Sequence, residues 1–150
     1  MDEVRMSQSK PDNFAPSVAL VAAWIVADKK VLFLEKCSNS LWGVPGGKVE
    51  AGETLLNGLC REVYEETDII LEPTRCAHLI DCYISKPGWN FTYHMFFYQL
   101  PSQPSVMLSA EHTNYKWVTL AEALSLPLMP GGDEIIGIFQ REVKKHGIIV

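Results

Sequence analysis

The sequence predicts an α/β protein, built as an α/β/α sandwich with a mixed β-sheet between helices. Three observations support this fold class. Short apolar segments rich in valine and aromatic residues recur along the chain and favour strands. An amphipathic helical pattern lies between these segments in the first half of the chain. Further capping and helical patterns follow towards the C-terminus.

The chain has 150 residues, of which 47% are hydrophobic. This is enough for one domain with a full-sized core and too little for two. Residues 1–14 are polar and mixed in charge, so we expect a flexible tail there. We expect residues 15–150 to form a single domain.

Charge and hydropathy argue against several classes of protein. The net charge of −5 is unlike that of a surface that binds a nucleic-acid polymer. The polar start of the chain is unlike a signal peptide, and the longest apolar run, residues 18–26, is too short to cross a membrane. The four cysteines form no C-x-x-C pair, so no zinc site is expected from them. We therefore expect a cytoplasmic protein without a membrane partner.

The first strands come next in the chain. Residues 17–27 are continuously apolar, "DKK" forms a turn, and residues 31–36 return as a second apolar segment. This pattern predicts an antiparallel hairpin in which one strand is buried on both faces. Residues 41–47 then predict a short strand that runs into a Pro-Gly-Gly turn.

A helix is predicted from about Thr54 to Thr67. Its apolar residues recur at offsets of three and four and form one stripe. Gly58 interrupts the pattern and weakens the helix by about 1 kcal/mol relative to alanine. We therefore expect Gly58 to pack closely against a neighbouring segment. The stripe consists of Leu55, Leu56, Leu59 and Val63.

Residues 76–85 and 91–100 are predicted as strands joined by the hairpin loop "KPGWN", and residues 115–118 as a further short strand. The segment 119–124 should open a helix, because Thr119 is followed at the capping-box position by a glutamate.

A last helix should run to about His146, with Asp133 as its N-terminal cap.

Three carboxylates crowd one arc of the predicted helix. At 3.6 residues per turn, Glu62, Glu65 and Glu66 lie close together, away from the apolar stripe. Their mutual repulsion would be relieved by a divalent cation, and Mg²⁺ binds a few carboxylates, several waters and substrate phosphates. Taken alone, however, the pattern is more typical of an acidic, solvated helix face without a ligand, because such runs are common in surface helices.

Residues around the carboxylates add to the pattern. Arg61 lies four residues before Glu65 and can also reach back to Glu53 at the helix entrance. A guanidinium in that place would hold carboxylates in a fixed orientation. The glycines of residues 45–47 and Gly52 permit sharp turns that bring a loop close to the helix.

The full stretch resembles the box of the Nudix hydrolase family, G-x5-E-x7-R-E-U-x-E-E-x-G-U, where U is a bulky aliphatic residue. One fixed position differs, because Asp68 stands where the family has glycine. Aspartate tolerates the left-handed conformation common at a helix end, so we expect this change to leave the ligands unaffected. The matching residues are Gly47, Glu53, Arg61, Glu62, Val63, Glu65, Glu66 and Ile69.

The resemblance implies a Nudix-type fold and a Mg²⁺-dependent pyrophosphohydrolase (Mn²⁺ being an alternative ion). The substrate would be a nucleoside diphosphate linked to another group, with a nucleoside triphosphate, oxidised or non-standard forms included, as the first expectation. ADP-ribose, nucleotide sugars and dinucleoside polyphosphates remain alternatives. So does a non-catalytic module that binds nucleotide. A homodimer is also compatible with the family.

By their position in the box, Glu62, Glu65 and Glu66 would be the metal ligands. Either Glu65 or Glu66 would also serve as base for the attacking water. Arg61 and Glu53 would brace these carboxylates.

Outside these positions, the backbones of Gly46 and Gly47 would offer a carbonyl ligand to the metal. Glu111 is the candidate for the additional glutamate that several members of the family use. Lys36, at the end of the second strand, would contact a phosphate.

Aromatic and histidine residues outside the box give no comparable pattern. For the aromatic side chains we expect core or hairpin packing rather than stacking on a nucleobase, and for the histidines we expect structural roles. The residues concerned are Trp42, Trp89, Phe91, Tyr93, His78, His94 and His112.

Overall fold

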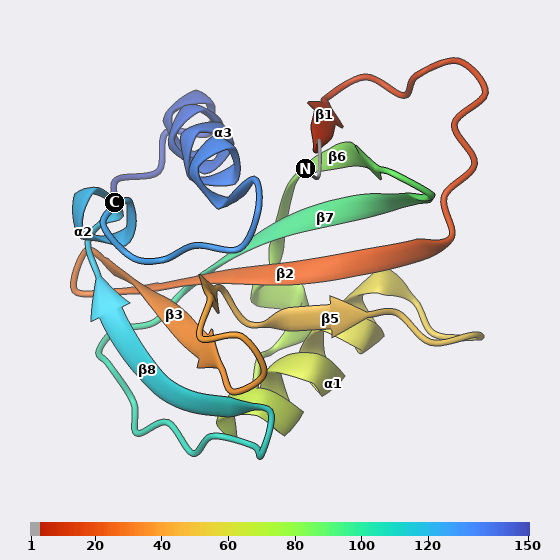
Figure 1. Cartoon of the computed structure of the whole chain (residues 1–150). Coiled ribbons are helices and arrows are strands. Elements are labelled where there is room, and N and C mark those ends of the chain that lie inside the picture. Colours follow the sequence, from red (N-terminus) through yellow and green to blue (C-terminus); the bar gives the residue numbers. More distant parts are fainter. Residues whose placement is uncertain (1–3) are drawn as a thin grey trace.

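The computed structural model describes residues 4–150, which form one eight-stranded mixed sheet with helices on both faces (Figure 1). The main strand order is β1-β6-β7-β2-β3-β4, while β5 pairs with β2 and β8 pairs with β3. The elements are β1 Arg5–Ser7, β2 Val18–Ala27, β3 Lys30–Lys36, β4 Trp42–Gly43, β5 Gly46–Lys48, α1 Leu55–Thr67, the 3₁₀ helix η1 Pro73–Arg75, β6 Ala77–Lys86, β7 Trp89–Gln99, β8 His112–Val118, α2 Leu120–Ala123 and α3 Gly132–Lys145.

Strand β2 is the centre of the sheet. It pairs in parallel with β7 along nearly its whole length, and residues 21–27 are buried. On its other edge, β3 pairs antiparallel with Val26 and Ala27, whereas β5 pairs antiparallel with residues 20–22. Because β3 and β5 take different stretches of one edge, the sheet divides there. The predicted hairpin and its doubly buried strand are confirmed.

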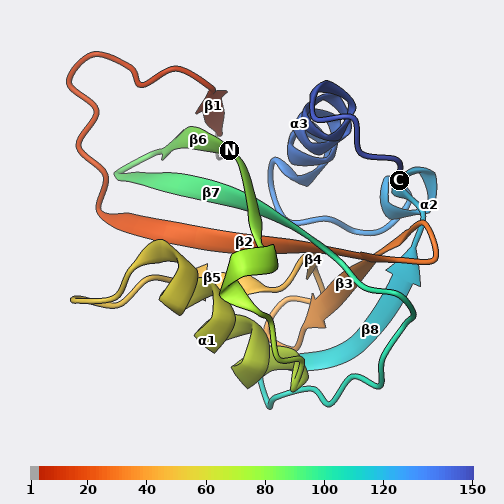
Figure 2. The same ribbon diagram turned by 180° about the vertical axis from the view of Figure 1, so that it is seen from behind.

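Helices α1 and α3 lie on opposite faces of the sheet (Figure 2), and an apolar core lies on each face. On one face α1 packs through Leu59 and Val63, which are almost completely buried. On the other face α3 covers the sheet, and Phe139 stacks on Trp24 with ring centroids 4.3 Å apart. The three-layered α/β/α class is therefore confirmed.

Local sequence signals set the ends of α1. The hydroxyl of Thr54 accepts a hydrogen bond from the Asn57 backbone N–H at 3.1 Å. At the other end Asp68 adopts the left-handed conformation, with φ of 65°. A side-chain carbon at Gly58 would lie 3.2 Å from Cγ2 of Val49, so the expected close packing is also present.

Part of the expected N-terminal tail is ordered. Arg5–Ser7 forms β1 and pairs with residues 83–85 of β6, and Phe14 packs edge-on against the ring of Tyr83. Without β1, that edge of β6 would present unpaired backbone N–H and C=O groups. Backbone pairing does not require alternating apolar residues in β1, so the polar sequence of residues 5–7 did not indicate a strand. Residues 1–3 of the expected tail lie outside the described residues.

Two further expectations are corrected by backbone pairing and capping. Strand β8 begins at His112, earlier than predicted, because its pairing with β3 continues through polar, exposed positions. Helix α3 is capped by Gly131, whose φ is 83°, and Asp133 lies in its first turn. An acidic residue there interacts favourably with the helix dipole. The capping box of Thr119 and Glu122 is present as predicted.

Within residues 4–150, no helix is long and apolar enough to span a membrane.

Candidate active site

The site is built where α1 packs against β5. An Oε1 atom of Glu66 accepts a hydrogen bond from the Gly46 backbone N–H at 2.9 Å. A side-chain carbon at Gly46 would overlap the backbone of β2, and one at Gly47 would overlap the Glu62 carboxylate. Both positions therefore require glycine if β5 is to lie between β2 and the carboxylates of α1.

Arg61 holds the entrance and the middle of α1 together. Its guanidinium binds Glu53 at two points, 2.7 Å and 3.0 Å, and the Lys48 carbonyl at 3.0 Å. Its Nη1 donates to Glu62 at 3.0 Å and to Glu65 at 3.1 Å. The Arg61–Glu53 contact expected from the sequence is thus present, and the arginine fixes three carboxylates of the box.

The carboxylates differ in electrostatic state. Glu66 is only 6% exposed, and this burial raises its pKa to about 8, with the charges of Glu62 and Glu111 adding to the effect. Burial also raises the pKa of Glu62, although Arg61 opposes the shift. By contrast, the hydrogen bonds from Arg61 lower the pKa of Glu53 to about 2. Without a cation, Glu66 is therefore largely protonated at neutral pH.

A second group of polar side chains comes from β3 and the start of β8. Glu111 and His112 place potential ligand atoms within 4.8 Å of those of Glu66. Lys36, the register partner of His112, lines the same cleft and is close enough to Glu66 to lower its pKa. Pairing of β8 with β3 thus brings Glu111 and Lys36, both predicted from the sequence, to the carboxylates of α1.

His112 is a residue of this site that the sequence analysis missed. It was expected to have a structural role, but it lines the cleft beside Glu66 and Glu111. Its Nδ1 is buried and has no hydrogen-bond partner among residues 4–150. Burial lowers its pKa below the usual value, so the ring is neutral at pH 7 and keeps a lone pair available. Its adjacency to Glu111 was the one signal in the sequence.

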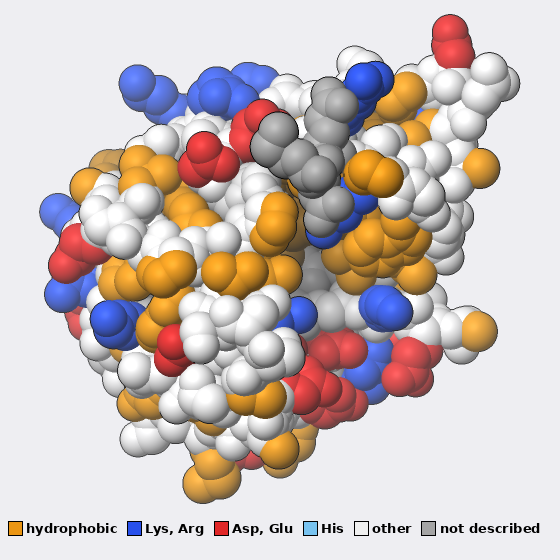
Figure 3. All heavy atoms as spheres, in the orientation of Figure 1, with side chains coloured by type: hydrophobic (Ala, Val, Ile, Leu, Met, Phe, Trp, Pro, Cys, Tyr) orange, Lys and Arg blue, Asp and Glu red, His pale blue; other side chains and the backbone are white. Residues whose placement is uncertain are grey.

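The site opens into a cleft of about 760 Å³ at the division of the sheet. Figure 3 shows acidic side chains grouped below a hollow in this face, with hydrophobic side chains beside it. The volume is within the range of small-molecule pockets. The expected packing of Trp42, Trp89, Phe91 and Tyr93 is present, because all four belong to the apolar core on the α3 face or pack against it. The same side chains, together with Trp24 and Phe33, also form walls of the cleft.

The predicted site residues therefore fall into two adjoining groups. The first group lines the cleft. The second group lies on α1 and at its entrance, outside the cleft, and its members are joined by hydrogen bonds; Glu65, whose side chain is 54% exposed, belongs to it. The first group is Lys36, Gly46, Gly47, Glu62, Glu66 and Glu111, and the second is Glu53, Arg61 and Glu65.

Comparison with known proteins agrees with this geometry. The family model of the NUDIX domain matches residues 16–137. The chain belongs to the Nudix family. Members of this Nudix family are hydrolases that generally use divalent metal ions, so the resemblance drawn from the box is confirmed and the protein is a Nudix hydrolase.

Three Nudix relatives illustrate the range of similarity. A MutT-like protein of Streptomyces ambofaciens is 36% identical over 116 residues, which are 76% of this chain and 72% of that protein. The CTP pyrophosphohydrolase of Escherichia coli is 29% identical over 126 residues, or 81% and 90% of the two chains. The crystal structure of the MutT protein from Methanosarcina mazei is 30% identical, with a TM-score of 0.72 and coverage of 86% and 96%.

Proposed function

We propose that the protein cleaves the pyrophosphate linkage of a nucleoside triphosphate, oxidised or non-standard forms included. The observation that carries this proposal is the crowding of Glu62 and Glu66 against β5, beside a cleft of about 760 Å³ with aromatic walls. A cation would bridge the carboxylates and the charged phosphates of the substrate, and the nucleobase would stack against the aromatic rings. The similarity to a CTP pyrophosphohydrolase supports the choice of a triphosphate.

The donor set of this site fits Mg²⁺ or Mn²⁺. Carboxylate and carbonyl oxygens are the ligands that such ions prefer. The raised pKa values of Glu62 and Glu66 reflect burial and crowded negative charge, which a cation would compensate. We assign Glu62, Glu65 and Glu66 as ligands, together with a backbone carbonyl of Gly46 or Gly47.

A bound ion would neutralise charge on the phosphate oxygens and make a coordinated water more acidic. The chain itself supplies the remaining functions. Lys36 faces the carboxylates from the end of β3 and would pair with a phosphate of the substrate. Glu111, within 4.8 Å of Glu66, would accept the proton of the attacking water, with Glu65 and Glu66 as the competing bases.

Arg61 and Glu53 would act as positioning residues. Their two-point contact leaves the Arg61 Nη1 directed at Glu62 and Glu65. Because three carboxylates share one guanidinium, their oxygens keep a fixed separation before a cation arrives. Preorganisation of this kind reduces the free energy required to assemble a metal site.

The substrate can be tested with a Mg²⁺-dependent panel of nucleoside triphosphates, ADP-ribose, nucleotide sugars and dinucleoside polyphosphates. The products would be separated and the released phosphates identified. We expect the highest kcat/KM for a triphosphate. A higher value for any other class would refute the substrate assignment. Binding of nucleotides without Mg²⁺-dependent turnover on the whole panel would refute the enzymatic assignment and favour a binding module.

A further inference from the structure

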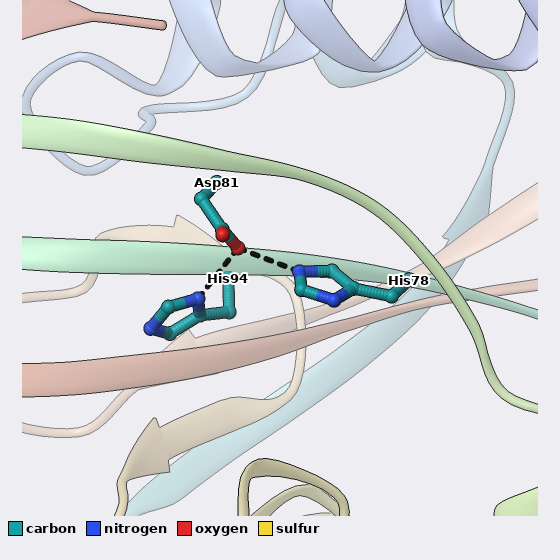
Figure 4. A group of neighbouring side chains, drawn as sticks. All are labelled: His78, Asp81 and His94. Atoms are coloured by element: carbon teal, nitrogen blue, oxygen red, sulfur yellow. Dashed lines mark hydrogen bonds and ion pairs between the residues drawn. The ribbon is translucent and has the colours of Figure 1, made fainter. Parts of the chain in front are cut away.

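A second group of metal-ligating side chains lies on the sheet face that also carries α1. His78 and Asp81 come from β6, and His94 comes from β7. Figure 4 shows both imidazole rings directed at one carboxylate oxygen. The distances to Oδ1 of Asp81 are 2.6 Å from Nε2 of His78 and 2.6 Å from Nδ1 of His94.

An irregularity in β6 makes this convergence possible. Residues three apart on a regular strand project from opposite faces of the sheet. The register shifts between His78 and Ile80, so that His78 pairs with Phe96 while Asp81 pairs with His94. A β-bulge of this kind inserts one residue and redirects the side chains after it. It therefore brings His78 and Asp81 to the same face, and the pairing of Asp81 with His94 adds the third side chain.

The group is distinct from the carboxylate site. His94 pairs with Val21 of β2, and Val21 pairs with Gly47 of β5. Two inter-strand spacings, about 10 Å, therefore separate His94 from Gly47. The two sites share no residue and face the same layer of the molecule.

We propose that His78, Asp81 and His94 bind one divalent transition-metal ion, with Zn²⁺ as the reference ion. Two imidazole nitrogens and one carboxylate oxygen are a donor set that suits Zn²⁺ and its neighbours in the first transition series. Mg²⁺ prefers oxygen ligands, so the ion proposed for the carboxylate site would not compete effectively here.

Both imidazole rings are held in place before binding. The ring of His78 stacks on Phe96 with centroids 4.6 Å apart, and the side chain of His94 is only 13% exposed. These contacts hold both rings in place, which limits the entropy lost on coordination. The partial exposure of His78 and Asp81, 41% and 35%, leaves open coordination positions to water.

Asp81 is suited to its part in this site. Burial raises its pKa, but the hydrogen bonds from His94 and His78 outweigh that effect and lower it overall. The carboxylate is therefore ionised at neutral pH and offers its oxygen without the loss of a proton. The ion would replace the two N–H···O contacts and join β6 to β7.

Calorimetric titration of the full chain with Zn²⁺, in excess Mg²⁺ at pH 7.5, tests the proposal. Because Glu66, Glu111 and His112 also converge, the titration is repeated in a Glu66→Gln background. We expect one Zn²⁺ site to persist in that background. Visible absorption of Co²⁺ as a substitute gives a second readout of nitrogen ligation at the same site.

The matched variants are His78→Gln and His94→Asn, whose amide nitrogens can still donate to Asp81 and so preserve the fold. We expect each to weaken Zn²⁺ binding at least about tenfold and to change the Co²⁺ spectrum. His146→Gln removes an exposed histidine of the C-terminal region and should change neither.

Absence of a Zn²⁺ site in the Glu66→Gln background would overturn the proposal, and so would equal affinities in the histidine variants. The three residues would then form only a hydrogen-bonded group. Neither result bears on the proposed hydrolase function, because turnover depends on Mg²⁺ at the carboxylates and is measured in a separate assay.

Discussion

At the scale of single residues, the site depends on the contrast between Arg61 and Glu66. Arg61 is hydrogen-bonded to three carboxylates, and its hydrogen bonds lower the pKa of one of them, Glu53, to about 2. Glu66 receives one backbone N–H and is buried, and the effect of this burial, with the charges of Glu62 and Glu111, outweighs the opposing effect of Lys36, so its charged form is unfavourable. One carboxylate of the box, Glu53, is therefore stabilised as an anion by the protein, whereas another, Glu66, is held largely protonated at neutral pH.

Replacing Arg61 by lysine tests the first half of this contrast. Lysine keeps the positive charge but cannot make the two-point contact with Glu53 or reach Glu62 and Glu65 at the same time. We expect the free energy of unfolding to fall by about 1–3 kcal/mol and turnover to fall by at least about tenfold.

Urea unfolding and steady-state kinetics measure the two effects. Arg141→Lys, on the exposed face of α3, is the control and should change neither. Wild-type values for both in the Arg61→Lys protein would refute the bracing role.

The pH dependence of stability tests the second half. The pKa of Glu66 is about 8 in the folded protein and near 4.5 when unfolded, so the folded state holds the extra proton between these values. Stability of the metal-free protein should be highest below about pH 4.5, as far as this group is concerned. It should decline as pH rises to about 8, by up to about 4 kcal/mol.

Urea unfolding in excess chelator at pH 5, 6.5 and 8 measures this decline. The Glu66→Gln variant lacks the titrating group and should show a flatter profile. Parallel profiles for the two proteins would contradict the assignment of the raised pKa to Glu66.

At the scale of elements, α1 is specified locally whereas its partners are not. Thr54, Asp68 and the apolar spacing of Leu59 and Val63 mark the helix in the sequence, and the structure reproduces these ends. The start of β8 could not be predicted, because backbone pairing with β3 extends it through polar residues. For the same reason the placement of His112 was not foreseen.

The contact between α1 and β5 gives a prediction about glycine. A side chain at Gly46 would meet the backbone of β2, which cannot move without disturbing the sheet. We expect Gly46→Ala to destabilise the fold by about 1–3 kcal/mol and to reduce turnover, because β5 must shift away from Glu66.

Gly137→Ala is the matched substitution in the interior of α3, where, among residues 4–150, the new carbon meets only the Arg141 side chain at 3.6 Å. It should stabilise the fold by about 0.5–1 kcal/mol. Thermal unfolding of both variants measures the difference. Equal changes in stability for Gly46→Ala and Gly137→Ala would show that β5 is not held tightly between β2 and α1.

The one departure from the family box can be tested at the end of α1. Asp68 has φ of 65°, a conformation that glycine adopts without steric cost. We expect Asp68→Gly to raise stability by about 0.5–1 kcal/mol and to leave turnover unchanged. A large change in turnover would mean that Asp68 has a part in the site beyond ending the helix.

At the scale of the whole molecule, the cleft exists because β3 and β5 divide one edge of β2. The carboxylates reach it from α1 on one side. On the other side Lys36 reaches it from β3, and Glu111 and His112 reach it from the turn before β8 and the first residue of that strand. A single amphipathic helix could be predicted from the sequence, but the opposite wall comes from strands distant in the chain. The group of His78, Asp81 and His94 likewise depends on a β-bulge in β6, which the hydrophobic periodicity of the sequence does not predict.

The most direct test of the whole account is the Mg²⁺-dependent turnover of Glu66→Gln on the best triphosphate of the panel. Glu72→Gln, an exposed glutamate just before η1, serves as the matched control. We expect the Glu66 variant to lose at least about 100-fold in turnover with its fold intact, and the control to match the wild type. Undiminished turnover in Glu66→Gln, or wild-type turnover that persists in excess chelator, would contradict the claim that these carboxylates hold an ion required for cleavage of the substrate.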